Sequence, residues 1–455
     1  MRSDELLCHR SRDTRMFFVQ EDGGSYAIDM SDRWNSETVV SDRSVTGQEG
    51  IDGLVGDGSI QSYVADDATV TYLVVGTNDG LVRETDDWET TEVPGPDSGV
   101  VVIVTDRRVV FVVGNCRDPD VDGDDVRVVD HANVEDASVA NSLLSTRFTV
   151  TAADGVALSV TPTATDGLQD IANYVTKAAR RWRSARDFFD DFGERLIDVE
   201  EAFADDEAAG QKRRRKLVKG LSDLGQTSSL HAIDLPALDA DRDAARTRLD
   251  HATCRGCWHR ARELIEAGDD HLAADALADA VTSYRDACAA LRAMGEDGEL
   301  AEAAFSEGSL AMELGPFDIE PALRDRLATC RERAADADVA VTTVWPVLVD
   351  GYDDLQSAHR FVGRVLDADL DGLADATAAA RSEAADAFDG AIKRAEQRGD
   401  EAEEAGDSDA AREHFEEALA LLDERASVTG EHDTDLRERL DEKVERSKWE
   451  WVGDR

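Results

Sequence analysis

Hydrophobic and polar positions follow two different rhythms along the chain. Up to about position 161, short β-branched runs alternate with turn residues, at 70–75, 100–104, 109–113, 126–129, 148–152 and 156–160. Phe148, Val150 and Ala152 alternate with polar neighbours, the period of two typical of a strand with one buried face. Asp154-Gly155, between the last two runs, favours a tight hairpin because glycine accepts the positive φ of the turn. The pattern predicts short antiparallel strands.

At Asp166 the period becomes helical, and Leu168, Ile171, Val175 and Trp182 recur on one face of the expected helix. A helix that follows antiparallel strands must bury this stripe on the sheet. Farther on the composition shifts to Ala, Asp, Glu, Arg and Leu, and the helical period continues to about position 447. The sequence predicts an α+β multidomain protein, an antiparallel β-barrel or sandwich closed by one helix and followed by an all-α region.

Four segments of the strand-rich part carry a resemblance to a known family. Gly99–Val113 consists of an apolar strand, a Thr-Asp-Arg-Arg turn and a second apolar strand, and Val128–Ala140, Leu143–Thr151 and Gly167–Val175 follow as further strands and a helix. In this order, residues 57–183 resemble a bacterial-type pleckstrin-homology (PH-like) domain. The resemblance implies a binding or scaffolding module without catalytic residues.

Two helical segments share a spacing of small and aromatic residues. Gly268, His271, Ala280, Tyr284 and Ala287 fall at offsets that Gly399, Ala402, Ala411, Phe415 and Ala418 repeat. This spacing resembles tetratricopeptide (TPR) repeats, in which small residues let two antiparallel helices approach and the aromatic ring fills the groove between hairpins. Generic antiparallel helix packing explains the same spacing, and both interpretations stay open.

These patterns divide the chain into four parts. We expect a weakly ordered N-terminal extension over residues 1–56 and the PH-like β domain with its closing helix over 57–183. A charged helical linker with a basic run is expected over 184–250, and an all-α, TPR-like helical-hairpin region over 251–455.

The chain is strongly acidic. Its 455 residues include 99 acidic and 50 basic side chains, which gives a formal net charge of −49. Apolar residues make up 42 % of the chain, enough to exclude global disorder. Such an acidic excess destabilises a compact protein by self-repulsion unless salt screens it, and the Debye length falls to about 3 Å near 1 M salt. We therefore expect a halophilic, cytoplasmic protein, since neither a secretory signal nor a transmembrane segment is found in the sequence.

Cys254 and Cys257, in a Cys-x-x-Cys arrangement between His251 and His259, form the best metal-like cluster. A structural zinc site needs four ligands and usually draws on two such pairs, whereas this region supplies one. Thiols that pack between helices are the favoured interpretation, and these two cysteines remain weak metal candidates. No cofactor is predicted.

A basic strip over residues 177–219 contrasts with the acidic remainder of the chain. Its candidate contacts for an anionic ligand or a membrane surface are Arg181, Arg183, Lys212, Arg213, Arg214, Arg215 and Lys216. High salt weakens contacts to phosphates, so a nucleic acid is not the expected partner. The alternative is intramolecular, with the strip lying against acidic helices.

Motifs of local catalytic sites are absent from the sequence, including a phosphate loop, Gly-x-Ser-x-Gly and His-Glu-x-x-His. We expect a non-catalytic interaction or scaffold protein that binds protein partners through both modules, with Tyr284 and Phe415 in contact with the partner. One alternative is a peripheral membrane or anionic-ligand module that uses the basic strip. Another is an enzyme whose site is assembled in the helical region.

The charge predicts a steep dependence of folding on salt. Dilution from molar to millimolar salt lengthens the Debye length to about 30 Å at 0.01 M, and the acidic surface then repels itself. We expect loss of helical circular dichroism or a strongly lowered melting temperature in low salt. Melting curves that coincide in high and low salt would contradict the halophilic interpretation.

Overall fold

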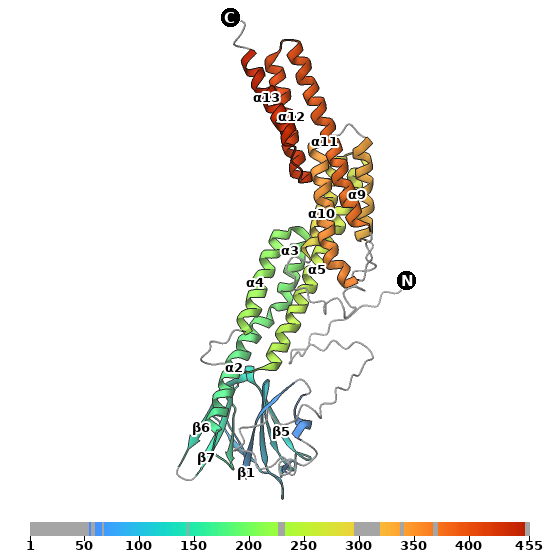
Figure 1. The fold of residues 1–455 in the computed structure, drawn as a ribbon. Coiled ribbons are helices and arrows are strands. Elements are labelled where there is room, and N and C mark those ends of the chain that lie inside the picture. The colour runs from blue at the N-terminus through green and yellow to red at the C-terminus, as the bar shows by residue number, and fades with distance from the viewer. Residues whose placement is uncertain are drawn as a thin grey trace, which may run out of the picture.

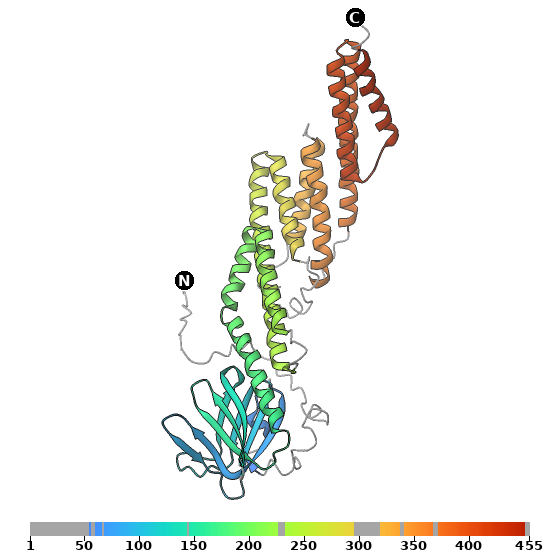
Figure 2. The same ribbon diagram turned by 90° about the vertical axis from the view of Figure 1, so that its left-hand side faces the viewer.

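In a computed structural model, which describes residues 54–55, 60–65, 68–142, 145–225, 233–294, 319–336, 341–366 and 372–450, the protein is an elongated α+β molecule. An antiparallel sheet occupies one end, and a rod of helices leads away from it to the C-terminal helices at the other end (Figures 1 and 2). The predicted α+β class, with strands first and helices after, is confirmed. Within the described residues no helix is long and apolar enough to span a bilayer.

The sheet has eight strands, seven of which follow the order β5-β4-β3-β1-β8-β7-β6, while β2 pairs with β1. Every pairing is antiparallel. The strands are β1 (Val70–Glu84), β2 (Glu89–Glu92), β3 (Val100–Thr105), β4 (Arg108–Val113), β5 (Asp125–Asp130), β6 (Val134–Asn141), β7 (Thr146–Ala152) and β8 (Ala157–Pro162). Two short 3-10 helices accompany them, η3 (Ile60–Tyr63) and η4 (His131–Asn133).

The longest strand, β1, joins the two halves of the sheet. Its first part pairs with β3 and its last part with β2 and β8, with an irregular register between Gly76 and Leu81. The run predicted at 70–75 is therefore only the first part of β1. The strand β2 was not predicted because Glu-Thr-Thr-Glu has no apolar alternation.

Both faces of β3 and β4 are buried, which explains their uninterrupted apolar runs. Val100, Val102 and Val104 face one core with α2 (Leu168–Asp190), while Val101 and Ile103 face a second, smaller core. The stripe predicted for α2 lies on the first core, as expected for an amphipathic helix beside a sheet.

The smaller core is covered by residues on the N-terminal side of the sheet. Leu54, Val55 and Ile60 pack on it, and the carbonyl oxygen of Leu54 accepts a hydrogen bond from the N–H of Gly99 at 3.0 Å. The predicted extension over residues 1–56 lies outside the described residues except for Leu54 and Val55, which belong to this cover.

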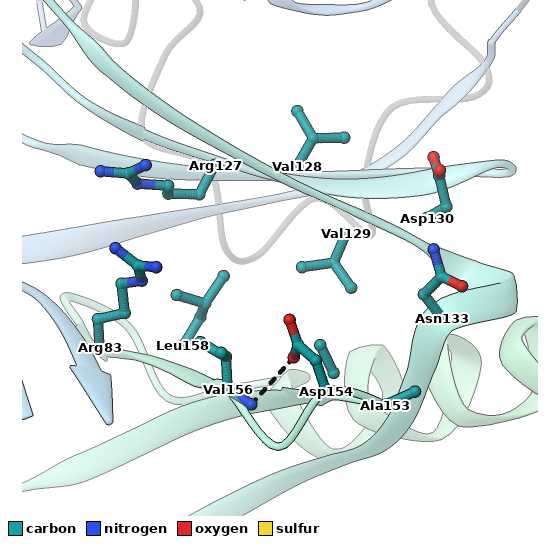
Figure 3. A pocket seen from close by; sticks show the side chains of 11 residues that line it. Arg83, Arg127, Val128, Val129, Asp130, Asn133, Ala153, Asp154, Val156 and Leu158 are labelled. Atoms are coloured by element: carbon teal, nitrogen blue, oxygen red, sulfur yellow. Dashed lines mark hydrogen bonds between the residues drawn. The ribbon is translucent and has the colours of Figure 1, made fainter. Parts of the chain in front are cut away.

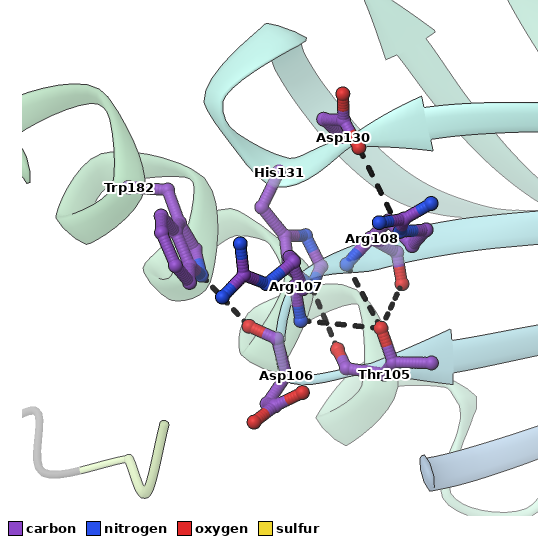
Figure 4. A network of polar contacts seen from close by, with 7 residues as sticks. All are labelled: Thr105, Asp106, Arg107, Arg108, Asp130, His131 and Trp182. Carbon is purple, nitrogen blue, oxygen red and sulfur yellow. Dashed lines mark hydrogen bonds and ion pairs between the residues drawn. The ribbon is translucent and has the colours of Figure 1, made fainter. Parts of the chain in front are cut away.

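The Thr-Asp-Arg-Arg turn between β3 and β4 connects the sheet to the helical rod (Figure 4). The buried carboxylate of Asp106 accepts hydrogen bonds from the N–H of Thr69 at 2.9 Å and of Ala237 at 2.7 Å. Ala237 lies in the first turn of α5 (Pro236–Ala273), so Asp106 satisfies a helix N–H that has no partner within the helix. The indole of Trp182 donates to the Asp106 carbonyl oxygen at 2.7 Å, which ties α2 to the same turn.

Two further side chains fix this turn. The Nε2–H of buried His131 donates to the Thr105 carbonyl oxygen at 2.8 Å, and burial lowers the pKa of His131 to about 4, so the ring is neutral at ordinary pH. The Arg107 guanidinium lies 5.2 Å from the Trp182 ring centroid and pairs with Asp241 of α5 at 3.0 Å. The turn therefore contacts the sheet, α2 and α5 together.

The helical rod is a succession of helices, each packed mainly on its neighbours. After α2 they are α3 (Phe192–Asp205), α4 (Glu207–Gly225), α5, α6 (Leu277–Ala293), α9 (Ile319–Asp336), α10 (Val341–Leu366), α11 (Leu373–Glu404), α12 (Ser408–Thr429) and α13 (Thr434–Glu450). The boundary predicted at 250/251 falls inside α5, whose 38 residues span about 57 Å. The predicted linker and the predicted helical-hairpin region are therefore joined by one uninterrupted helix.

Glycines placed against aromatic rings set two of the helix contacts. A side chain at Gly268 of α5 would overlap the ring of Tyr284 on α6, and one at Gly399 of α11 would overlap Phe415 on α12. The shared spacing found in the sequence therefore marks two closely packed hairpins.

We expect Gly399→Ala to destabilise the protein by about 1–3 kcal/mol, because the new methyl group must displace the Phe415 ring from a packed site. Gly390→Ala on the same helix is the matched control, since its Cβ would meet only the Arg394 side chain at 3.4 Å. The control should gain up to about 1 kcal/mol from helix propensity. Denaturant unfolding in high salt measures both, and equal effects would show that the Gly399 contact is not tight.

Candidate functional site

A cleft of about 560 Å³ opens where β5 faces the β7–β8 hairpin and the end of β1 (Figure 3). We call it the β5 cleft. Its lining comes from β1, β5, η4 and β7–β8, and comprises Arg83, Arg127, Val128, Val129, Asp130, Asn133, Ala152, Ala153, Asp154, Val156 and Leu158. No single segment of the sequence forms it, because topology brings these strands together.

The floor of the β5 cleft is apolar, and one of its walls is an edge strand. Val129 and Leu158 belong to the main core of the sheet. Among the described residues β5 pairs with β4 only, which leaves the backbone groups of its outer edge without a strand partner. Val126 and Val128, which alternate along β5 with Arg127 and Val129, are 37 % and 49 % exposed, and Val128 also lines the edge of the cleft.

The exposed valines continue the smaller core beyond its cover. In the β4–β5 register, Val128 lies opposite Val110 and Val126 opposite Val112, and both of these partners are buried under the N-terminal segment. The apolar face therefore extends onto β5 without being covered there. Asp125, Arg127 and Asp130 are interspersed with apolar residues along β5, and charge of this kind is one way in which natural sheets protect an edge strand.

Charged groups sit at both ends of the β5 cleft (Figure 3). Arg83 and Arg127 lie at one end, where Arg83 stacks on the Trp88 ring with 4.9 Å to its centroid. Asp130 and Asp154 lie at the other end, and Asp154 accepts the N–H of Val156 at 3.1 Å within the hairpin turn. No carboxylate of the described residues lies within ion-pair distance of Arg83.

Arg127 is held by two carboxylates at the rim. Its Nη2 lies 3.0 Å from Oε1 of Glu92 and 3.0 Å from Oδ2 of Asp125. Burial, together with the neighbouring Asp125, raises the pKa of the Glu92 carboxyl to about 7, although Arg127 opposes this shift. One guanidinium does not stabilise two buried negative charges, so Glu92 retains its proton up to near neutral pH.

The chemistry of the lining fits binding. The residues that line the β5 cleft include two carboxylates, Asp130 and Asp154, one amide, Asn133, and no hydroxyl, thiol, imidazole or amine side chain. The cleft therefore offers backbone hydrogen-bonding groups, aliphatic surface, two guanidinium groups and two carboxylates.

The basic strip predicted over 177–219 does not form one surface. Arg181 donates to the carbonyl oxygens of Leu224 and Ile233, and Arg183 to that of Ala179 one turn earlier. Arg213 pairs with Asp198 of α3, and Arg214 is buried against Asp250 of α5 at 2.9 Å, so these two contacts join α4 to its neighbouring helices. Only Arg213 and Arg214 therefore contact carboxylates of other helices, as the intramolecular alternative expects, whereas Arg181 and Arg183 donate to backbone carbonyl oxygens and Lys212, Arg215 and Lys216 are exposed.

Tyr284 and Phe415, predicted to contact a partner, are both 0 % exposed. Their rings fill the space beside Gly268 and Gly399 inside their own hairpins, and the Tyr284 hydroxyl donates to Asp269 at 2.7 Å. Packed in this way, neither ring is accessible to a partner. The spacing that suggested a binding groove is required by the interior of each hairpin.

Cys254 and Cys257 are buried in α5, and burial raises the pKa of both thiols, to about 12 for Cys257. Gly256 between them lets α3 approach closely, because a side chain there would overlap the Glu200 carbonyl and Phe203. In the part of the chain that the structure describes, no group of three His, Cys, Asp or Glu side chains is placed to hold a metal ion. The Cys-x-x-Cys spacing is thus accounted for by helix packing.

Comparisons of the chain with protein-family models, curated proteins and solved structures found no match. The PH-like and TPR-like resemblances therefore remain predictions. Arg83, Glu92 and Arg127 were not singled out in the sequence, since their proximity depends on strand order. The available signal was the apolar run at 126–129, which directly follows an Asp-rich loop.

The raised pKa of Glu92 predicts a pH-dependent stability. Because the folded protein binds this proton more tightly than the unfolded chain, stability falls as pH rises from about 4.5 to about 7. Glu92→Gln mimics the protonated form and still accepts from Arg127, so it should raise the melting temperature at pH 8 but not below about pH 5. Glu89→Gln is the control, because Glu89 is exposed on the same strand. This variant should shift the melting temperature by the same amount at pH 8 and below about pH 5. A gain from Glu92→Gln that is the same at both pH values would contradict the assignment.

Proposed function

We propose that this is a non-catalytic interaction protein whose sheet domain binds an extended segment of a protein partner at the β5 cleft. The observation that carries the proposal is the outer edge of β5, which has no strand partner among the described residues and combines exposed Val126 and Val128 with a cleft whose floor is apolar. An edge strand in this setting is a template for strand addition, in which a partner supplies the missing strand.

Both faces of an added strand find a matching surface. Every second side chain of the added strand would cover Val126 and Val128 and complete the apolar face that continues from β4. The intervening side chains of the added strand would enter the cleft beside Val129 and Leu158. Main-chain hydrogen bonds then supply affinity and the alternating side chains supply selectivity.

The PH-like resemblance supports a binding role for this domain. The four segments that carry the resemblance coincide with β3–β4, β5–β6, β7 and the start of α2. The Thr-Asp-Arg-Arg turn in the first segment holds structural contacts (Figure 4), in keeping with a family motif that carries no catalytic residue. We accordingly propose a PH-like domain in which α2 closes the sheet.

The helical rod suits a scaffold. Its helices pack on sequence neighbours, as α5 does on α6 and α11 on α12, and also on helices farther along the chain, as α6 does on α10, and they separate the sheet domain from the C-terminal helices (Figure 2). We propose that the rod spaces the β5 cleft from surfaces farther along the chain, in the salt-rich cytoplasm that the acidic excess indicates.

The test is selection of linear peptides from a display library on the full chain in molar potassium chloride. We expect selected peptides to have alternating apolar residues and to bind Val128→Asp at least about tenfold more weakly, because a charge beside the added strand must be desolvated. Fluorescence anisotropy measures the affinities.

Ile197→Asp is the matched control, because Ile197 is likewise an exposed aliphatic residue, 59 % exposed, but lies on α3. This variant should bind the selected peptides as the unaltered protein does. Failure to select any peptide, or peptides that bind Val128→Asp with unchanged affinity, would refute strand addition at β5.

A further inference from the structure

Four cations form a continuous face on α4. Lys212, Arg215, Lys216 and Lys219 follow the i, i+3, i+4, i+7 spacing of one helix face, and all four are exposed. The buried residues of α4 are Gly210, Arg214, Leu217 and Leu221, which lie on the opposite side of the helix. We call the exposed stripe the α4 basic face; it extends about 10 Å along the helix axis.

The charges of the α4 basic face are not neutralised by the surrounding fold. Among the described residues no carboxylate lies within 4.0 Å of any of these four side chains. Some exposed cations elsewhere on the rod do reach carboxylates of a neighbouring helix, as Arg398 does with Glu417 and Arg439 with Glu396. In a chain of net charge −49, a cationic face that has no carboxylate partner among the described residues favours an external anionic one.

The flanks of the α4 basic face limit the shape of its partner. Asp198 of α3 pairs with Arg213 on one side of α4, and Asp243 of α5 lies beside Val218 and Ser222 on the other. Each of these carboxylates is paired with an arginine, Asp198 with Arg213 and Asp243 with Arg242, so the positive charge that lacks an ion-pair partner among the described residues is confined to a narrow stripe along α4. A narrow anionic rod laid along α4 meets only the cations.

We propose that the α4 basic face docks an acidic helix of a protein partner. Carboxylates repeated at i, i+3, i+4 and i+7 on that helix would match the four cations in both spacing and length. Because none of the large exposed apolar side chains of the described residues lies on α4, charge pairing sets the orientation and register of this contact. The face is separate from the β5 cleft, and this proposal does not depend on strand addition.

The test uses a fluorescent synthetic helix that carries Glu at these intervals, titrated with the full chain over a potassium chloride series. Lys212→Gln, Arg215→Gln, Lys216→Gln and Lys219→Gln together should weaken its binding at least about tenfold and remove most of the salt dependence. Circular dichroism checks that the variant is folded.

The matched control removes four exposed cations of α11 and α13, with the same change in net charge, at Lys393, Arg394, Arg439 and Lys448. It should bind the acidic helix as the unaltered protein does, and so should Val128→Asp. A helix with the same residues in shuffled order should bind at least about tenfold more weakly than the matched helix.

Three results would overturn the proposal. One is absence of binding, or equal binding by the protein lacking the four cations of α4. Another is equal affinity for the matched and shuffled helices, which would reduce the effect to general charge attraction. The last is tighter binding to vesicles of anionic lipid or to a single-stranded oligonucleotide, which would assign the face to a phosphate-bearing partner.

Discussion

The Asp106 carboxylate is the point on which the arrangement of the molecule depends. It accepts one hydrogen bond from the start of the sheet, at Thr69, and one from the first turn of α5, at Ala237. Burial raises its pKa, and the backbone donors act against that shift by stabilising the charged form. Since α5 continues for 38 residues into the rod, the direction of the rod is set at this turn. Trp182 of α2 donates to the Asp106 carbonyl oxygen, and Arg107 pairs with Asp241 of α5. The sheet and the rod therefore meet through one network of polar contacts, part of which is drawn in Figure 4.

In this acidic chain, the carboxylates around an arginine determine whether the arginine has a structural role. Arg214 is buried and shares Asp250 with Arg246, and Arg326 forms two short contacts with Asp269 beside Tyr284. These cations hold helices together and are not available to a ligand. On α4, by contrast, Lys212, Arg215, Lys216 and Lys219 are exposed and have no carboxylate of the described residues within ion-pair distance. In concentrated salt, contacts to these cations act over short distances, which favours partners of matching shape.

The two proposed surfaces use different physics, and the rod relates them in space. At the β5 cleft, the attraction comes from backbone hydrogen bonds and from burial of Val126 and Val128. Hydrophobic contacts of this kind persist in concentrated salt. At the α4 basic face the attraction is electrostatic, and it mainly determines the orientation in which a partner binds. Because α4 packs on α3 and α5, and Asp106 joins α5 to the sheet, both surfaces belong to one connected framework.

Sequence periodicity determined the class of the elements and much of their position. The period of two at 148–152, the Asp154-Gly155 turn and the helical stripe from Leu168 each predicted the observed local structure, because these signals come from backbone geometry and from one buried face. Tertiary structure alone decided which faces are accessible. It buried Tyr284 and Phe415 behind glycines and divided the basic strip into structural and exposed cations. It also placed Arg83 and Arg127, far apart in sequence, at one cleft. Accessibility and proximity depend on which strands and helices become neighbours, and a local pattern carries no information about that choice.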